Sequence, residues 1–176
     1  MRVSTINNIP SREGKAMLNH ISDYTTAERR AITRALNIVR EKSPSFAKQH
    51  EFKTAAATIE YCSLMLTDAT KEKFACLFLD SQHRLIDSEI LFTGTINSAT
   101  VYPRELVSKV LYHNAAAIIL CHNHPSGIPE PSEADKRLTR DIIDVMRKID
   151  VAVLDHIIVG NANGCPSVSL AQRGLM

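Results

Sequence analysis

The sequence contains no tryptophan, and aromatic residues make up only 5% of its 176 residues. It therefore offers few of the aromatic side chains on which proteins that bind single-stranded nucleic acid stack bases. No apolar run approaches the roughly 20 residues that a membrane-spanning helix needs. The N-terminal residues are polar where a signal peptide would need an apolar run. We therefore expect a cytoplasmic protein with no membrane partner.

Cysteine is also scarce, and its spacing carries no motif. The four residues, Cys62, Cys76, Cys121 and Cys165, form no C-x-x-C pair and resemble no disulfide framework. In a reducing compartment such cysteines are expected to act as small buried hydrophobic residues.

The net charge is only +2, so overall electrostatics do not indicate a nucleic-acid or membrane partner. The charge is unevenly distributed, however. Residues 1–50 hold nine Lys and Arg against four Asp and Glu, whereas the remainder holds 12 against 15. The basic N-terminal part is the one feature here that favours an acidic partner such as DNA.

The chain divides into two parts near residue 50. Thr25 and Glu28 form an S/T-x-x-E capping signature ahead of a helical pattern, and Ser43-Pro44-Ser45 then interrupts that pattern. We predict an N-terminal helical or partly ordered segment over residues 1–50. The whole chain is 44% hydrophobic. Residues 51–176 therefore hold enough apolar material for one compact domain.

The second part alternates between helical and strand patterns. Apolar runs at 74–79 and 85–92, joined by a turn at 80–83, predict a β-hairpin. Pro103 stands where a helix would begin. Further helices are predicted near 55–66 and 138–149, and further strands at 116–121 and 151–159. This order predicts a mixed α/β fold in which helices flank a mixed sheet.

The informative stretch is His122-Asn123-His124, followed by a Pro- and Gly-containing loop and then Ser132 to Asp135. Residues two apart on an extended backbone point to the same side, so His122 and His124 can aim two imidazoles at one point, whereas Cys121 points away. Asp135 falls in the first turn of the next helix. Two imidazoles, a carboxylate and a water form an open tetrahedral site suited to catalytic Zn²⁺.

A structural interpretation of the same residues stands beside this one. Ser132-x-x-Asp135 is also a helix capping box, which is sensible without any metal. A histidine pair at a strand end is also commonly hydrogen-bonded and inert. Capping and metal binding are compatible, because Ser132 can cap the helix while Asp135 binds the ion. The letters His-Asn-His do not indicate an HNH nuclease, in which these residues are widely separated.

The pattern H-x-H-x₇-S-x-x-D resembles the signature of JAMM (MPN-domain) metalloproteases. The surrounding sequence resembles the RadC family over about residues 52–172. The segments that carry this resemblance are Gly94-Thr95-Ile96-Asn97, Tyr102-Pro103-Arg104-Glu105, Ile119 to Gly127 and Leu154 to Gly160. The resemblance implies a JAMM-like, cytidine-deaminase-like fold. The first 50 residues do not match the helix-hairpin-helix segment that longer RadC proteins carry.

The same resemblance implies an upstream glutamate that acts as general base and acid, and the chain offers two candidates. Glu89 lies in the strand predicted at 85–92, ahead of the Pro103 helix, as the pattern requires. Glu105 lies in the first turn of that helix, where a carboxylate complements the helix dipole. We favour Glu89 as the catalytic residue. By the same resemblance, Ser132 would stabilise the oxyanion rather than attack the substrate.

Asp155-His156 interrupts an otherwise apolar strand, so its polar groups need partners. Support of the metal site and hydrogen bonding elsewhere in the sheet both remain open. The leading functional hypothesis is a zinc-dependent hydrolase of an amide or isopeptide bond. The alternatives are a DNA-repair-associated or nucleic-acid-binding accessory protein, supported by the basic N-terminal helix, and a metal-stabilised interaction module without turnover.

Overall fold

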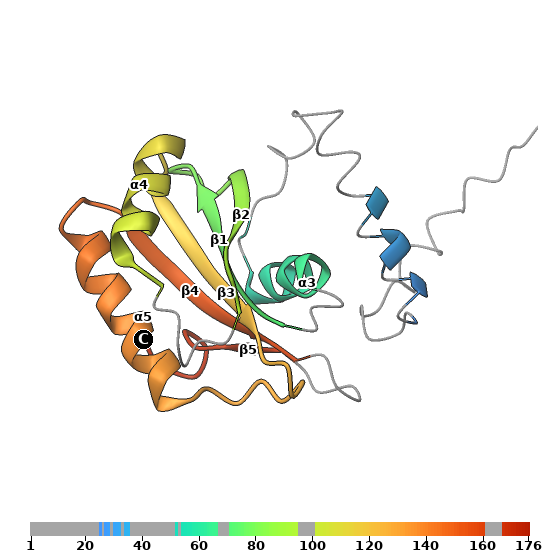
Figure 1. The fold of residues 1–176 in the computed structure, drawn as a ribbon. Coiled ribbons are helices and arrows are strands. Elements are labelled where there is room, and N and C mark those ends of the chain that lie inside the picture. Colours follow the sequence, from blue (N-terminus) through green and yellow to red (C-terminus); the bar gives the residue numbers. More distant parts are fainter. Residues whose placement is uncertain are drawn as a thin grey trace, which may run out of the picture.

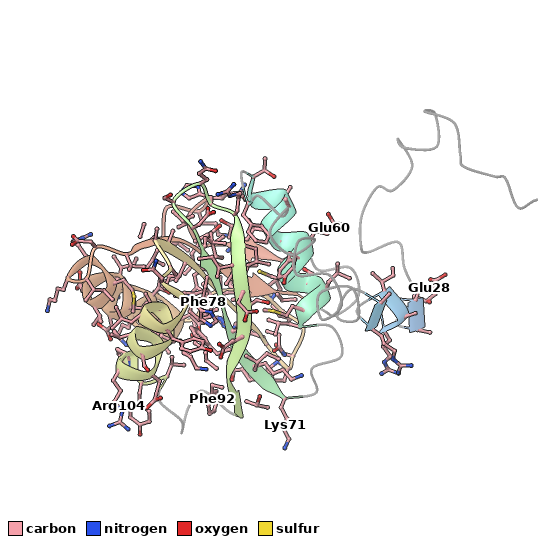
Figure 2. All side chains as sticks on the ribbon, turned by 90° about the horizontal axis from the view of Figure 1, so that it is seen from above. Glu28, Glu60, Lys71, Phe78, Phe92 and Arg104 are labelled. Atoms are coloured by element: carbon pink, nitrogen blue, oxygen red, sulfur yellow. The ribbon has the colours of Figure 1, made fainter. Side chains whose placement is uncertain are left out.

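A computed structural model describes Thr25, residues 27–28, 30–32 and 34–35, Phe52 and, continuously, residues 54–66, 71–94, 101–160 and 167–176. In it a five-stranded sheet lies between helices. Helix α3 (Ala55–Met65) covers one face, and helices α4 (Pro103–His113) and α5 (Glu133–Arg147) cover the other (Figure 1). Figure 2 shows the same layers from above, with Phe78 on the side of α4.

The sheet is mixed, as the sequence predicts. Its strands are β1 (Glu72–Leu79), β2 (Leu85–Gly94), β3 (Ala117–Asn123), β4 (Ala152–Val159) and β5 (Val168–Ser169). They lie in the order β2-β1-β3-β4-β5, with β3 and β4 parallel and the other pairs antiparallel. Antiparallel pairing of β1 with β3 sets the start of β1 beside the end of β3, where Phe74 pairs with His122.

Strand β3 is buried along its whole length because both faces of the sheet are covered. Alternation divides its side chains between two cores. Ile119 and Cys121 pack on the α3 side, whereas Ile118 and Leu120 pack on the side of α4 and α5. Cys121 thus faces away from the side chain of His122, as expected. The three described cysteines, Cys62, Cys76 and Cys121, are buried and free, whereas Cys165 lies outside the described residues.

The helix ends follow the local signals in the sequence. Thr54 caps α3 by accepting a hydrogen bond from the Ala57 amide. Pro103 occupies the first turn of α4. Asn114 ends that helix in the left-handed region, with φ of 49°, a conformation that asparagine tolerates better than most residues. The predicted capping box between Thr25 and Glu28 is also present, with both reciprocal hydrogen bonds.

Two features of the sheet escape the sequence patterns. Strand β5 has only two residues, too few for any periodicity. Strand β4 is irregular, because Ile118 pairs with Val153 while Ile119 pairs with Asp155. The extra residue, Leu154, forms a bulge that reverses the alternation of the residues after it. No helix in the described part of the chain is long and apolar enough to cross a membrane.

Replacement of Leu120 by Ala should destabilise the fold strongly. Leu120 is fully buried in the centre of β3, so Leu120→Ala leaves a cavity and should lower the free energy of unfolding by about 2–5 kcal/mol. Urea denaturation measures this loss. The control is Leu111→Ala on α4, where the side chain is 64% exposed, and a change of less than about 0.5 kcal/mol is expected. Equal losses in the two variants would contradict the assigned burial.

Candidate metal centre

His122 and His124 converge at the end of β3. His122 is the fully buried penultimate residue of the strand, and His124 follows directly after its end. Their Nε2 atoms lie 3.0 Å apart. The other ring nitrogen of His124, Nδ1, donates to the carbonyl oxygen of Ile128 at 2.8 Å. A neutral His124 therefore presents the lone pair of Nε2 toward His122.

Asp135 reaches the same point from the first turn of α5. Its two carboxylate oxygens lie 3.3 Å from Nε2 of His122 and 3.5 Å from Nε2 of His124. The Ser132 amide and hydroxyl both donate to Asp135, at 2.7 and 2.6 Å, and the Asp135 amide donates back to the Ser132 hydroxyl. The capping box and the convergence on the histidines therefore occur together, as the compatible interpretation predicts.

The hydrogen bonds of this cluster shift its protonation equilibria. Burial alone would raise the pKa of Asp135, but hydrogen bonds from His122, His124 and Ser132 outweigh it and hold that pKa well below its ordinary range. The hydrogen bond to Asp135 raises the pKa of His124 above 6.5. The cluster therefore pairs an ionised carboxylate with two imidazoles, of which His124 accepts a proton readily.

A second carboxylate, that of Glu72, joins the histidine pair. One ligand atom from each of Glu72, His122 and His124 lies within 4.8 Å of the other two. Glu72 begins β1, beside the end of β3. Asn123 holds this part of the backbone, because its buried side-chain amide donates to the Lys71 carbonyl at 3.2 Å and accepts from the Lys73 amide at 2.9 Å.

Glu89 lies elsewhere on the same face of the sheet. It sits on β2 opposite Cys76, which in turn pairs with Leu120, so two strand spacings of roughly 5 Å each separate β2 from β3. Its carboxylate oxygens contact Nζ of Lys109 and Nε2 of His113, both at 2.6 Å. The structure thus joins Glu89 to helix α4 and to a second group, Asp87–Glu89–His113. The catalytic role expected from the sequence would instead require Glu89 to lie beside the histidine pair. Glu105 is exposed and pairs with Arg104.

The sequence carries only a weak signal for Glu72. Glu72 directly precedes the apolar run of the first hairpin strand. Antiparallel pairing of that strand with β3 is what sets it beside the H-x-H motif. The requirement for a glutamate upstream of the Pro103 helix is met equally by Glu72 and Glu89, so order along the chain does not separate them.

The donor set suits a divalent transition metal. Imidazole nitrogens and carboxylate oxygens are the ligands of zinc and of related ions. In the described residues, Glu72, His122 and His124 form one group that could hold a metal ion, and Asp135 contacts both histidines of that group. A cation between the two Nε2 atoms, which lie 3.0 Å apart, would be attracted by the lone pairs that neutral imidazoles present there.

Residues 52–175 match the RadC-like JAB domain family. The chain belongs to this family. A UPF0758 protein of Vibrio parahaemolyticus is 54% identical over 114 residues, which cover 65% of this chain and 50% of the relative. A UPF0758 protein of Alteromonas mediterranea is 54% identical over 129 residues, which cover 73% and 56%. The RadC-like chain thus spans about half the length of these relatives. Its JAMM/MPN-type domain carries the cluster described above.

Replacement of Glu89 should weaken the attachment of α4 to β2 in a pH-dependent way. Burial opposes ionisation, but hydrogen bonds from Lys109 and His113 lower the pKa of Glu89 below 4.5. A lowered pKa stabilises the fold above the unfolded-state pKa, and this stability is lost as the pH falls through the folded-state pKa. Because Lys109 is partly exposed, Glu89→Gln should cost only about 1 kcal/mol at about pH 6.

The difference between wild type and Glu89→Gln should begin to shrink as the pH falls through the ordinary glutamate pKa of about 4.3, where the unfolded chain takes up a proton. It should vanish once the pH has fallen through the lower pKa of folded Glu89. Denaturation curves at a series of pH values measure it. Glu105→Gln is the control, since the Glu105 side chain is 66% exposed. A loss for Glu89→Gln that grows toward low pH would contradict the assigned ion pairs.

Proposed function

We propose that this RadC-like domain is a zinc-dependent hydrolase that cleaves an amide or isopeptide bond. The observation that carries the proposal is the convergence of His122, His124, Asp135 and Glu72 at the junction of β1, β3 and α5. JAB domains are often metal-dependent hydrolases. We assign His122, His124 and Asp135 as the zinc ligands. Three protein ligands leave a fourth position open, which is the arrangement of catalytic zinc sites.

A zinc ion bound by these residues would polarise a substrate carbonyl and lower the pKa of a coordinated water toward 7. The protein must then move a proton, because an amine leaves poorly unless it is protonated. Glu72 suits this task. It is only half-buried and lies beside the histidine pair, so it can take a proton from the attacking water and pass it to the leaving amine.

We therefore assign the acid–base role to Glu72, in place of the expected Glu89. Glu89 is held by Lys109 and His113, which stabilise its ionised form and leave it a weak proton acceptor. Asp135 is also a poor candidate, because it is almost fully buried and its oxygens already contact both histidines and Ser132.

Ser132 remains our candidate for stabilising the oxyanion. Its hydroxyl proton points to Asp135 at 2.6 Å. Stabilisation of an oxyanion would require the hydroxyl to turn from this carboxylate to the substrate. Once Asp135 binds a cation, its oxygen becomes a weaker acceptor, which favours such a turn.

The substrate is proposed from the chemistry alone as a peptide or an isopeptide-linked protein. DNA association remains the alternative from the sequence. Its support is the basic segment of residues 1–50, most of which lies outside the described residues. In the described part, the cluster of histidines and carboxylates favours hydrolysis over binding to an acidic polymer.

The protein should bind about one zinc ion per chain. His122→Ala and His124→Ala should each lose this ion, since two remaining ligands form a poor site. Equilibrium dialysis followed by elemental analysis measures the stoichiometry. His113→Ala is the control, because His113 belongs to the second group with Asp87 and Glu89. If His113→Ala lost zinc and His122→Ala retained it, the zinc site would have to be assigned to the second group on β2 and α4 instead.

Glu72→Gln should separate chemistry from metal binding. The amide is nearly isosteric but cannot accept a proton, so turnover of a fluorogenic peptide or isopeptide amide should fall roughly 10²–10⁴-fold. Zinc affinity should change little. Glu89→Gln should remain active after correction for its stability loss.

The two measurements on Glu72→Gln have distinct meanings. A loss of zinc affinity as large as that of His122→Ala would make Glu72 a metal ligand. Full activity in Glu72→Gln together with an inactive Glu89→Gln would return the acid–base role to Glu89.

A further inference from the structure

Thr139 and His156 lie directly behind His122. The Nε2 atom of His156 is 2.8 Å from Nδ1 of His122, and Nδ1 of His156 is 2.7 Å from the Thr139 hydroxyl. All three residues are fully buried. Phe74 packs against both imidazoles, with its ring centroid 6.3 Å from that of His122 and 5.7 Å from that of His156.

Thr139, His156 and His122 form a hydrogen-bonded relay, and the direction of each hydrogen bond in it follows from the end at Thr139. The Thr139 hydroxyl lies 2.6 Å from the Asp135 carbonyl oxygen, which can only accept, so the hydroxyl donates there. A hydroxyl has one proton. Toward His156 it can therefore only accept, and Nδ1 of His156 must carry a proton.

The same logic continues to His122. Neither ring nitrogen of His156 contacts a carboxylate in the described hydrogen bonds, and the ring is fully buried, so the neutral form is favoured. A neutral imidazole carries one N–H. Nε2 of His156 therefore accepts from Nδ1 of His122. A neutral His122 then has its lone pair on Nε2, the atom that faces His124 and Asp135.

We propose that Thr139 and His156 are positioning residues that fix His122 in the Nδ1–H tautomer and so present its Nε2 lone pair to the metal. The inference rests on the proposed metal centre and adds two residues to it. The relay starts at the carbonyl oxygen of Asp135, which accepts the Thr139 hydroxyl proton. One turn of α5 therefore supplies the ligand Asp135 and also sets the tautomer of the ligand His122.

Thr139→Val tests the relay. Valine has the shape of threonine but cannot accept the Nδ1 proton of His156. His156 should then move its proton to Nε2 and donate it to Nδ1 of His122, which places the His122 proton on Nε2. Zinc affinity should fall about 10–100-fold, measured by competition with a chromophoric chelator. Thr139→Ser keeps the hydroxyl and should bind zinc nearly as wild type does.

The tautomers can be observed without metal. Two-bond ¹H–¹⁵N correlations of metal-free protein at about pH 8, above the ordinary histidine pKa, should assign Nδ1–H to His156 in the wild type and Nε2–H to His156 in Thr139→Val. Thr58→Val is the matched control. Thr58 is a buried threonine on α3 that makes the same hydroxyl bond to a carbonyl four residues earlier, that of Thr54. It should lose similar stability without any change in zinc affinity or tautomer.

Three results would overturn the inference. One is an Nε2–H tautomer of His156 in the wild type. Another is wild-type zinc affinity in Thr139→Val. The third is the absence of zinc binding by the wild type itself, which would remove the proposed function and this inference together. The first two, found in a wild type that binds zinc, would overturn the inference alone.

Discussion

The end of β3 places two imidazole nitrogens 3.0 Å apart, one on the fully buried His122 and one on the partly exposed His124. Two neutral nitrogens that present lone pairs repel at this distance, so the pair is favourable only when a proton or another cation lies between them. The ionised Asp135 beside both histidines stabilises that positive charge. The surrounding hydrogen bonds then follow as a consequence. Ser132 satisfies the outer side of Asp135, and the Ile128 carbonyl satisfies the outer nitrogen of His124.

Burial of both faces of β3 lets three consecutive residues perform different tasks. His122 faces α5 and the carboxylate on its first turn. Asn123, with the opposite orientation in the strand, reaches across to the backbone on both sides of Glu72. His124 leaves the strand and bends back through the hydrogen bond to Ile128. The Asn123 bonds continue the β1–β3 connection past the last paired residues, Phe74 and His122. The middle residue of the motif therefore fixes the position of the second carboxylate.

The sequence predicted most of the fold and the core of the site, because these depend on local patterns. The hairpin, the helix starting at Pro103, the capping box at Ser132 and the convergence of His122 with His124 all follow from periodicity and short spacing. The position of Glu72 does not. It depends on which strand pairs with β3 and in what register, and two glutamates on neighbouring strands fit the same order along the chain. Long-range pairing carries no local signature that could choose between them.

The Asp155-His156 pair shows the same limit at the scale of one residue. Strict alternation from Val153, which packs on the α5 side, would turn Asp155 toward His122 and His156 away. The bulge at Leu154 reverses this order. Asp155 instead accepts bonds from Ser169 and Ala171 and anchors the C-terminal residues, while His156 contacts His122. A buried carboxylate behind His122 would have accepted its Nδ1 proton as well, but would have added a second negative charge next to Asp135. A neutral imidazole gives the same direction to the hydrogen bond without that charge. The inserted residue thereby sets both the geometry and the electrostatics behind the histidine pair.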